Sequence, residues 1–285
     1  MIKKQQLLEN DSELGMLFPE MDTYFKEEFG YINSISIMRS KKNKALNRAE
    51  FLFIMKEPGN NGRCTGEMIW KEILGIHKMM RNLEKIHNIK LDYLIVRENE
   101  FFELIKETAH NPLKEMISAQ TVLMYQENYW LEIKKAVDEG ISIKGIEEIN
   151  PAKISEKDII YNLGRFGYKE MGTEMEKGRD FCIETIITSL MLKGDARRIQ
   201  AIPVILGKNI ERGRKPIYNL LIFMAMKYKK SEKLLALLTL TGKLLPNKQI
   251  TDAIEIMNCI SIKPEKIDER GIKQKMEMYY ANQKR

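Results

Sequence analysis

The sequence predicts an α+β or α/β domain with a small mixed sheet, followed by an all-α basic domain. Three strand-like segments, at residues 31–40, 49–56 and 89–96, surround one long amphipathic segment. Beyond residue 150, apolar residues recur at helical spacing and no segment has the pattern of a strand. We therefore expect an α/β domain over residues 1–145 and a helical domain over residues 146–285.

The two halves also differ in charge. Residues 1–150 hold 21 Lys and Arg against 24 Asp and Glu, a net charge of −3. Residues 151–285 hold 26 against 16, a net charge of +10. Such an asymmetry bears on partners rather than on fold, and it predicts that the C-terminal half attracts a polyanion.

The first elements are a helix and two strands. In residues 18–30, "FPEMDTYFKEEFG", Met21, Phe25 and Phe29 recur every four residues, and Gly30 is a natural helix stop. Residues 31–40, "YINSISIMRS", have no cleanly polar side, which suits a central strand covered on both faces. Residues 49–56, "AEFLFIMK", are dense in aromatic and branched side chains and predict a second strand.

The long helix of this half should run from Glu67 to His87, where apolar residues keep helical spacing. The expected elements after it are a strand over 89–96, helices over 98–110 and 113–120, a strand over 121–125, and a helix over 128–140. The whole order is that of a compact α/β domain.

Composition excludes several classes of protein. The longest apolar runs, such as "LLIFMAM", are far shorter than the roughly 20 residues of a membrane helix, and the start lacks a signal-peptide core. Three cysteines lie far apart and three histidines lack ligand spacing, which argues against disulfides and against zinc. We expect a cytoplasmic protein without a membrane partner.

Four short segments carry a resemblance to a known family. They are "MRS" at residues 38–40, "RAEFLFIM" at 48–55, "LDYLIV" at 91–96 and "AQTVLMYQ" at 119–126. In this order and spacing, residues 20–140 resemble the nucleotidyltransferase fold of the DNA polymerase β type, in particular its small prokaryotic members. That family has a Gly-Ser turn after the first strand, a basic loop, Asp-x-Asp on the second strand and one more Asp on the third.

The resemblance implies roles for five residues. Glu50 and Asp92 match two of the family's carboxylates, which are catalytic and bind two Mg²⁺ ions. Ser40, Lys41 and Lys42 lie where the family binds nucleotide phosphates.

Two departures weaken the implied chemistry. The second carboxylate of Asp-x-Asp falls on Leu52, which cannot bind a hard cation, and the glycine of the turn is Arg39. We therefore expect a non-catalytic or weakly active core, with Mg²⁺ as a cofactor only if activity is retained.

In the helical half we expect helices over residues 155–167, 173–194, 195–209, 216–230, 231–245 and 252–260, and one in the tail after residue 263. The predicted N-caps are Ser155, Thr173, Asp195, Ser231, and either Asn247 or Thr251. Pro203 should kink or shorten the helix that contains it.

Basic clusters mark the candidate nucleic-acid contacts. Between Lys193 and Lys248 there are 13 Lys and Arg but only three acidic residues. The candidates are Arg197, Arg198, Lys208, Arg212, Arg214, Lys215, Lys227, Lys229 and Lys230. Phosphate contacts require such positive charge but no particular sequence.

Three functions follow from these patterns. The leading expectation is a nucleotidyltransferase-fold protein, non-catalytic or weakly active, that binds DNA or RNA through its basic helical half. The alternatives are an active metal-dependent nucleotidyltransferase and an antitoxin-like module that binds a protein partner. The last rests on family analogy alone.

Overall fold

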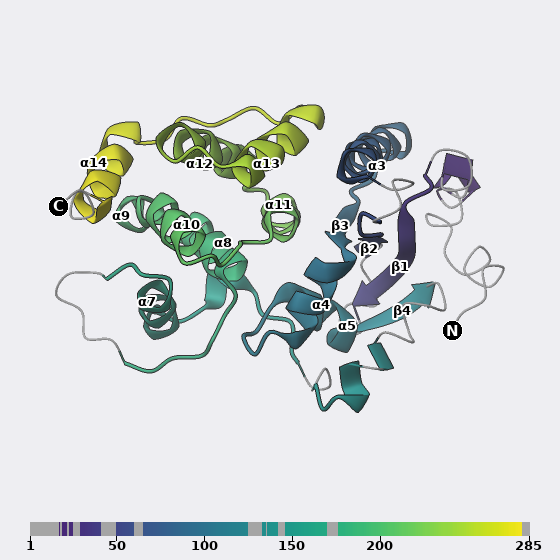
Figure 1. Cartoon of the computed structure of the whole chain (residues 1–285), viewed down its shortest axis with the longest axis horizontal. Helices are drawn as coiled ribbons and strands as arrows, with labels where there is room; N and C mark the ends of the chain where they lie inside the picture. The colour runs from purple at the N-terminus through teal and green to yellow at the C-terminus, as the bar shows by residue number, and fades with distance from the viewer. Residues whose placement is uncertain are drawn as a thin grey trace. The chain divides into compact units, whose positions relative to one another are not determined.

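The computed structural model describes residues 29–40, 50–59, 65–124, 136–141, 146–169 and 176–280, with isolated positions 17, 19–21, 23, 24, 133 and 134. The chain divides into two compact units, drawn in Figure 1. The sheet unit comprises Met1–Glu107 and Pro112–Glu148, and the helical unit comprises Thr108–Asn111 and Ile149–Arg285. Among the described residues, no helix has the length and apolar character needed to cross a bilayer.

The sheet has four strands in the order β3-β2-β1-β4. Strand β1 (Ile32–Ser40) pairs antiparallel with β2 (Glu50–Met55) and with β4 (Gln120–Met124). Strand β3 (Asp92–Arg97) pairs parallel with β2. The predicted mixed α+β character, with a small mixed sheet in the first half and helices in the second, is confirmed.

Helix α3 (Gly66–His87) makes the crossover that the parallel pair β2 and β3 requires. The Thr65 side chain accepts a hydrogen bond from the Met68 N–H at 3.3 Å and caps its start. The imidazole Nδ1 of His77 and the Tyr93 hydroxyl share a 3.1 Å hydrogen bond. This contact places α3 on the face of the sheet that carries Tyr93.

The helix predicted over 98–110 ends early. Helix α4 spans Glu98–Lys106, and α5 spans Pro112–Ala119. Between them, the His110 N–H donates to the Asp180 carbonyl at 2.9 Å, and the Cys182 N–H donates to the His110 carbonyl at 3.0 Å. These bonds use backbone groups that a longer helix would have needed for itself.

The helical unit is built around α11 (Tyr218–Lys227), which is largely buried and contacts α8, α12 and α13. The other elements are η1 (Pro151–Lys153), α7 (Glu156–Arg165), α8 (Ile183–Lys193), α9 (Ala196–Ile199), α10 (Ala201–Glu211), α12 (Ser231–Leu244), α13 (Lys248–Cys259) and α14 (Glu269–Tyr280). Its apolar side chains form a core of its own.

The prediction of one long helix over 173–194 is wrong for residues 176–182, because α8 begins at Ile183. The Arg179 N–H donates to Asp158 Oδ1 at 2.8 Å, and the Phe181 N–H donates to Asn162 Oδ1 at 3.0 Å. Side chains of α7 thus satisfy this backbone, so it stays extended. The predicted cap Thr173 lies outside the described residues.

Two of the predicted caps form as expected. Ser155 accepts a hydrogen bond from the Asp158 N–H at 3.1 Å, and Asp195 accepts one from the Arg197 N–H at 2.9 Å. Asn247, one of two alternatives, caps α13.

One local expectation needs correction, because Ser231 is the first residue of α12 rather than its cap, which is Lys230. The helix predicted over 195–209 is shortened as expected, since it is divided at Gln200 into α9 and α10. Pro203 lies in the first turn of α10, where a missing N–H is tolerated. Of the helix predicted over 18–29, positions 19–21, 23 and 24 are described and helical, whereas Phe29 is described and not helical. Of the helix predicted over 128–140, positions 133, 134 and 136–138 are helical, and residues 139 and 140 form a turn.

Candidate functional site

The two predicted metal ligands of the sheet unit lie directly beside each other. Glu50 opens β2, Asp92 opens β3, and they are partners in the parallel register. Register partners project to the same face of a sheet, so the two carboxylates share one face. Both residues are buried, with exposed fractions of 7% for Glu50 and 1% for Asp92.

The surroundings of this pair differ from a two-metal site. The Lys90 ammonium lies 3.3 Å from Asp92 Oδ1, so a cation of the chain itself already pairs with that carboxylate. Leu52, two residues after Glu50 on the same face, is fully buried and offers no ligand atom. No group of three or more side chains able to hold a metal occurs in the part of the chain that the structure describes.

Glu50 and Asp92 supply some, but not all, of what a single Mg²⁺ ion requires. Mg²⁺ in proteins is commonly held by one or two carboxylates together with substrate phosphates. Glu50 and Asp92 would be those carboxylates, but Lys90 competes for Asp92. The bridging of two ions by three carboxylates, which the family resemblance implies, is not supplied by the described residues.

Of the three predicted nucleotide contacts, the structure describes only the backbone of Ser40. Ser40 is the last residue of β1, where its Cα pairs with that of Gln120 on β4. It therefore lies at the end of the sheet where Glu50 and Asp92 begin their strands. Lys41 and Lys42 lie outside the described residues.

The helical unit carries the positive charge of the chain. Residues 108–111, 149 and 150 are uncharged, so this unit keeps the net charge of +10 and the sheet unit keeps −3. The nine predicted nucleic-acid contacts all belong to it, but the structure divides them into two groups.

Four of the nine are already engaged within the unit. Arg198 forms an ion pair with Glu156, and its side chain is only 16% exposed. The Lys208 ammonium lies 3.2 Å from Glu211 and 4.4 Å from the centre of the Tyr280 ring.

The other two engaged residues contact a backbone carbonyl and an aromatic ring. The Arg212 guanidinium donates to the Arg165 carbonyl at 3.1 Å. The Lys227 ammonium lies 5.7 Å from the centre of the Phe223 ring.

The pKa of Glu156 reflects this engagement. Burial alone would raise the pKa of its carboxyl, but hydrogen bonds from Arg198 and Lys193 lower it overall. The carboxylate is therefore charged at neutral pH and holds both cations. Through this carboxylate, Arg198 of α9 is joined to Glu156, the first residue of α7.

The remaining five form no ion pair with a carboxylate among the described residues. They are Arg197, Arg214, Lys215, Lys229 and Lys230. Arg214 and Lys215 precede α11, whereas Lys229 and Lys230 follow it. A ten-residue helix is about 15 Å long, so these two pairs lie at opposite ends of the central helix.

Sequence reasoning missed further exposed cations that also lack an ion pair within the described chain. They include Lys243, Lys248, Lys263, Lys266 and Arg270. Lys263 and Lys266 belong to the strap, which we define as residues 261–268, between α13 and α14.

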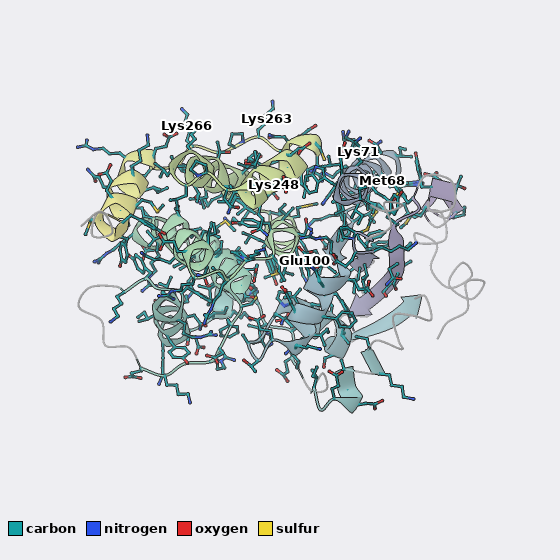
Figure 2. The ribbon with its side chains drawn as sticks, in the orientation of Figure 1. Met68, Lys71, Glu100, Lys248, Lys263 and Lys266 are labelled. Atoms are coloured by element: carbon teal, nitrogen blue, oxygen red, sulfur yellow. The ribbon has the colours of Figure 1, made fainter. Side chains whose placement is uncertain are left out.

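The strap is fastened to the start of α12. The Glu265 N–H donates to the Glu232 carbonyl at 3.2 Å, and the Lys233 ammonium lies 3.0 Å from Glu265. Figure 2 shows Lys263 and Lys266 projecting outward from the strap, with Lys248 on α13. The sequence "KPEK" could have suggested an exposed basic segment, but no local pattern shows what it packs against.

No protein-family model matches the chain, and no significant match to it was found among curated proteins or solved structures.

Proposed function

We propose that this chain is a nucleotidyltransferase-fold protein, non-catalytic or weakly active, whose helical unit binds nucleic acid through phosphate contacts. The observation that carries the binding proposal is a surplus of exposed basic side chains without carboxylate partners. Such residues among those described include Arg197, Arg214, Lys215, Lys229, Lys243, Lys248, Lys263, Lys266 and Arg270, all in the helical unit, whose net charge is +10. Basic side chains without internal partners are those that can neutralise phosphates.

The sheet unit supports the fold part of this proposal. A mixed sheet with a parallel pair, and with Glu50 and Asp92 aligned at the starts of β2 and β3, matches what the resemblance leads us to expect. The same unit argues against strong catalysis, because Leu52 replaces one carboxylate and Lys90 pairs with another. A net charge of −3 also makes it a poor partner for phosphate chains.

The test uses the full chain with labelled single-stranded and double-stranded DNA and RNA at low salt. We expect protein–nucleic acid complexes of reduced mobility in a gel, with little dependence on base sequence, because no base-reading element is identified.

A variant with Arg214→Glu, Lys215→Glu, Lys229→Glu and Lys230→Glu should bind more weakly. It changes only exposed or half-exposed side chains, so the fold should survive, as circular dichroism can verify. No complex with any of the four probes would overturn the proposal and favour the antitoxin-like module.

A second function is favoured by one observation, the register partnership of Glu50 and Asp92. Two carboxylates side by side could hold one Mg²⁺ and a nucleotide in an active transferase. Transfer of a labelled nucleotide to nucleic acid or protein, abolished by Glu50→Ala or Asp92→Ala, would establish it.

A further inference from the structure

The strap brings together basic residues that are far apart in the sequence. Because Glu265 bonds to Glu232, the strap lies beside the junction between α11 and α12. Lys263 and Lys266 are two residues before and one residue after Glu265. Lys229 and Lys230 are three and two residues before Glu232. We call these four lysines the strap patch.

The acidic residues of this region do not cancel its charge. Glu265 is paired with Lys233, whose side chain is only 18% exposed, so this carboxylate is not available to the strap patch. Glu232 and Asp268 are the other acidic residues of segment 229–233 and the strap, and the Asp268 carboxylate accepts a hydrogen bond from the Gln200 side-chain amide at 2.9 Å. Five lysines and three acidic residues leave a net charge of +2 on these two segments.

The shape of the patch suits a chain of phosphates better than a single anion. Three extended residues span about 10 Å, so Lys263 and Lys266 are separated along the strap and do not converge on one point. Lys229 and Lys230 extend the positive surface to a second segment. Flexible lysine side chains, each with an ammonium at its end, can reach successive phosphates without selecting a sequence.

We propose that the strap patch is the surface on which the helical unit holds the nucleic-acid backbone. This inference rests on the proposed function and deepens it, because it selects one site among the scattered basic residues. It assigns a role to Lys263 and Lys266, which sequence reasoning did not consider. In this proposal, the ion pair between Glu265 and Lys233 positions the strap.

The test compares two variants of the full chain with equal changes of charge. The strap variant carries Lys229→Glu, Lys230→Glu, Lys263→Glu and Lys266→Glu. The matched variant carries Arg214→Glu, Lys215→Glu, Lys243→Glu and Lys248→Glu, all exposed and without ion pairs in the described chain. Both lower the net charge by eight, so a general electrostatic effect would weaken both alike.

We expect the strap variant to bind a labelled single strand at least tenfold more weakly than the matched variant. Its log–log salt dependence should also be shallower by about 0.7 for each phosphate that is no longer neutralised. Equal losses of affinity in the two variants, or a larger loss in the matched variant, would overturn the assignment of the strap patch but leave nucleic-acid binding intact. Failure of the unmodified chain to bind would instead overturn the proposed function itself.

Discussion

The Asp158 carboxylate of α7 binds both the backbone and the side chain of Arg179. Its Oδ1 accepts the Arg179 N–H at 2.8 Å, and its Oδ2 accepts the guanidinium Nε and Nη2 at 3.2 and 3.0 Å. Asp158 itself is only 6% exposed. This pair holds residues 176–182 in an extended form beside α7 and fixes where α8 begins.

Replacing Asp158 by alanine should therefore destabilise the helical unit by about 2 kcal/mol, because a buried position loses its hydrogen bonds to a charged group. Urea unfolding followed by far-ultraviolet circular dichroism measures the change. Glu176→Ala is the control, since Glu176 pairs with Lys157 and both side chains are more than half exposed. Equal effects of the two substitutions would contradict this role of Asp158.

The same carboxylate should make the helical unit sensitive to acid. Burial alone would raise the pKa of Asp158, but hydrogen bonds from Arg179 and Ser155 lower it below its ordinary value. A lowered pKa in the fold means that the stabilisation is complete above the unfolded pKa and is lost as pH falls through the folded one. The Asp158→Ala variant should therefore show a smaller loss of stability below pH 4, in the same unfolding experiment.

His77 should give the sheet unit a separate pH dependence. Burial, with a smaller effect of Arg81, lowers the pKa of His77 to about 3. Between pH 6.5 and 3 the unfolded chain binds a proton that the folded chain does not, so stability falls as the pH falls through this range.

One proton corresponds to about 1.4 kcal/mol per pH unit, so the loss of stability from pH 6.5 to pH 5 should be about 2 kcal/mol. Trp70 and Trp130, the two tryptophans of the chain, both belong to the sheet unit and report on its unfolding by fluorescence. The His77→Gln variant should lose most of this pH dependence, whereas His87→Gln should keep it. An unchanged dependence in His77→Gln would show that another group titrates.

Gly207 of α10 allows a close approach of α14. A Cβ at this position would overlap the Tyr280 hydroxyl oxygen and lie 2.5 Å from Leu245 Cδ1. Gly207→Ala should therefore displace Tyr280 and loosen α14, at a cost of about 1–3 kcal/mol. Limited proteolysis should cut the C-terminal segment faster. In the control Gly66→Ala the new Cβ would lie 3.9 Å from Pro58, an ordinary van der Waals distance, and cleavage near α14 should not change.

The carboxylate pair of the sheet should not be needed for nucleic-acid binding. Glu50→Ala and Asp92→Ala should each bind a labelled strand as tightly as the unmodified chain, because both residues belong to the unit with net charge −3. A retardation assay measures this, with the strap variant as the positive control for weakened binding. Weakened binding in either alanine variant, with tryptophan fluorescence unchanged, would contradict it.

Sequence periodicity predicted the elements whose signals are local. The strands of the sheet, α3 and the caps at Ser155 and Asp195 were found because alternation, helical spacing and capping residues need no distant partner. The extended segment before α8 was missed, because its backbone is satisfied by Asp158 and Asn162, about 20 residues earlier. The helical spacing of apolar residues does not show that side chains of another helix will hydrogen-bond to this backbone.

The candidate contacts show the same limit. The sequence located the basic half of the chain, but not which cations would be paired inside it. Arg198 was predicted as a contact, yet Glu156 of another helix holds it. Lys263 was overlooked, because only the bond between Glu265 and Glu232 places the strap beside Lys230.

The most direct test of the central claim is the affinity of the full chain for a labelled single strand at salt concentrations between about 50 and 200 mM. Four phosphate contacts predict a log–log slope of about −2.8, which is roughly a 50-fold loss of affinity over this range. A straight line of at least that steepness would support phosphate binding by the helical unit. Binding that does not respond to salt, or no binding at the lowest salt concentration, would contradict it.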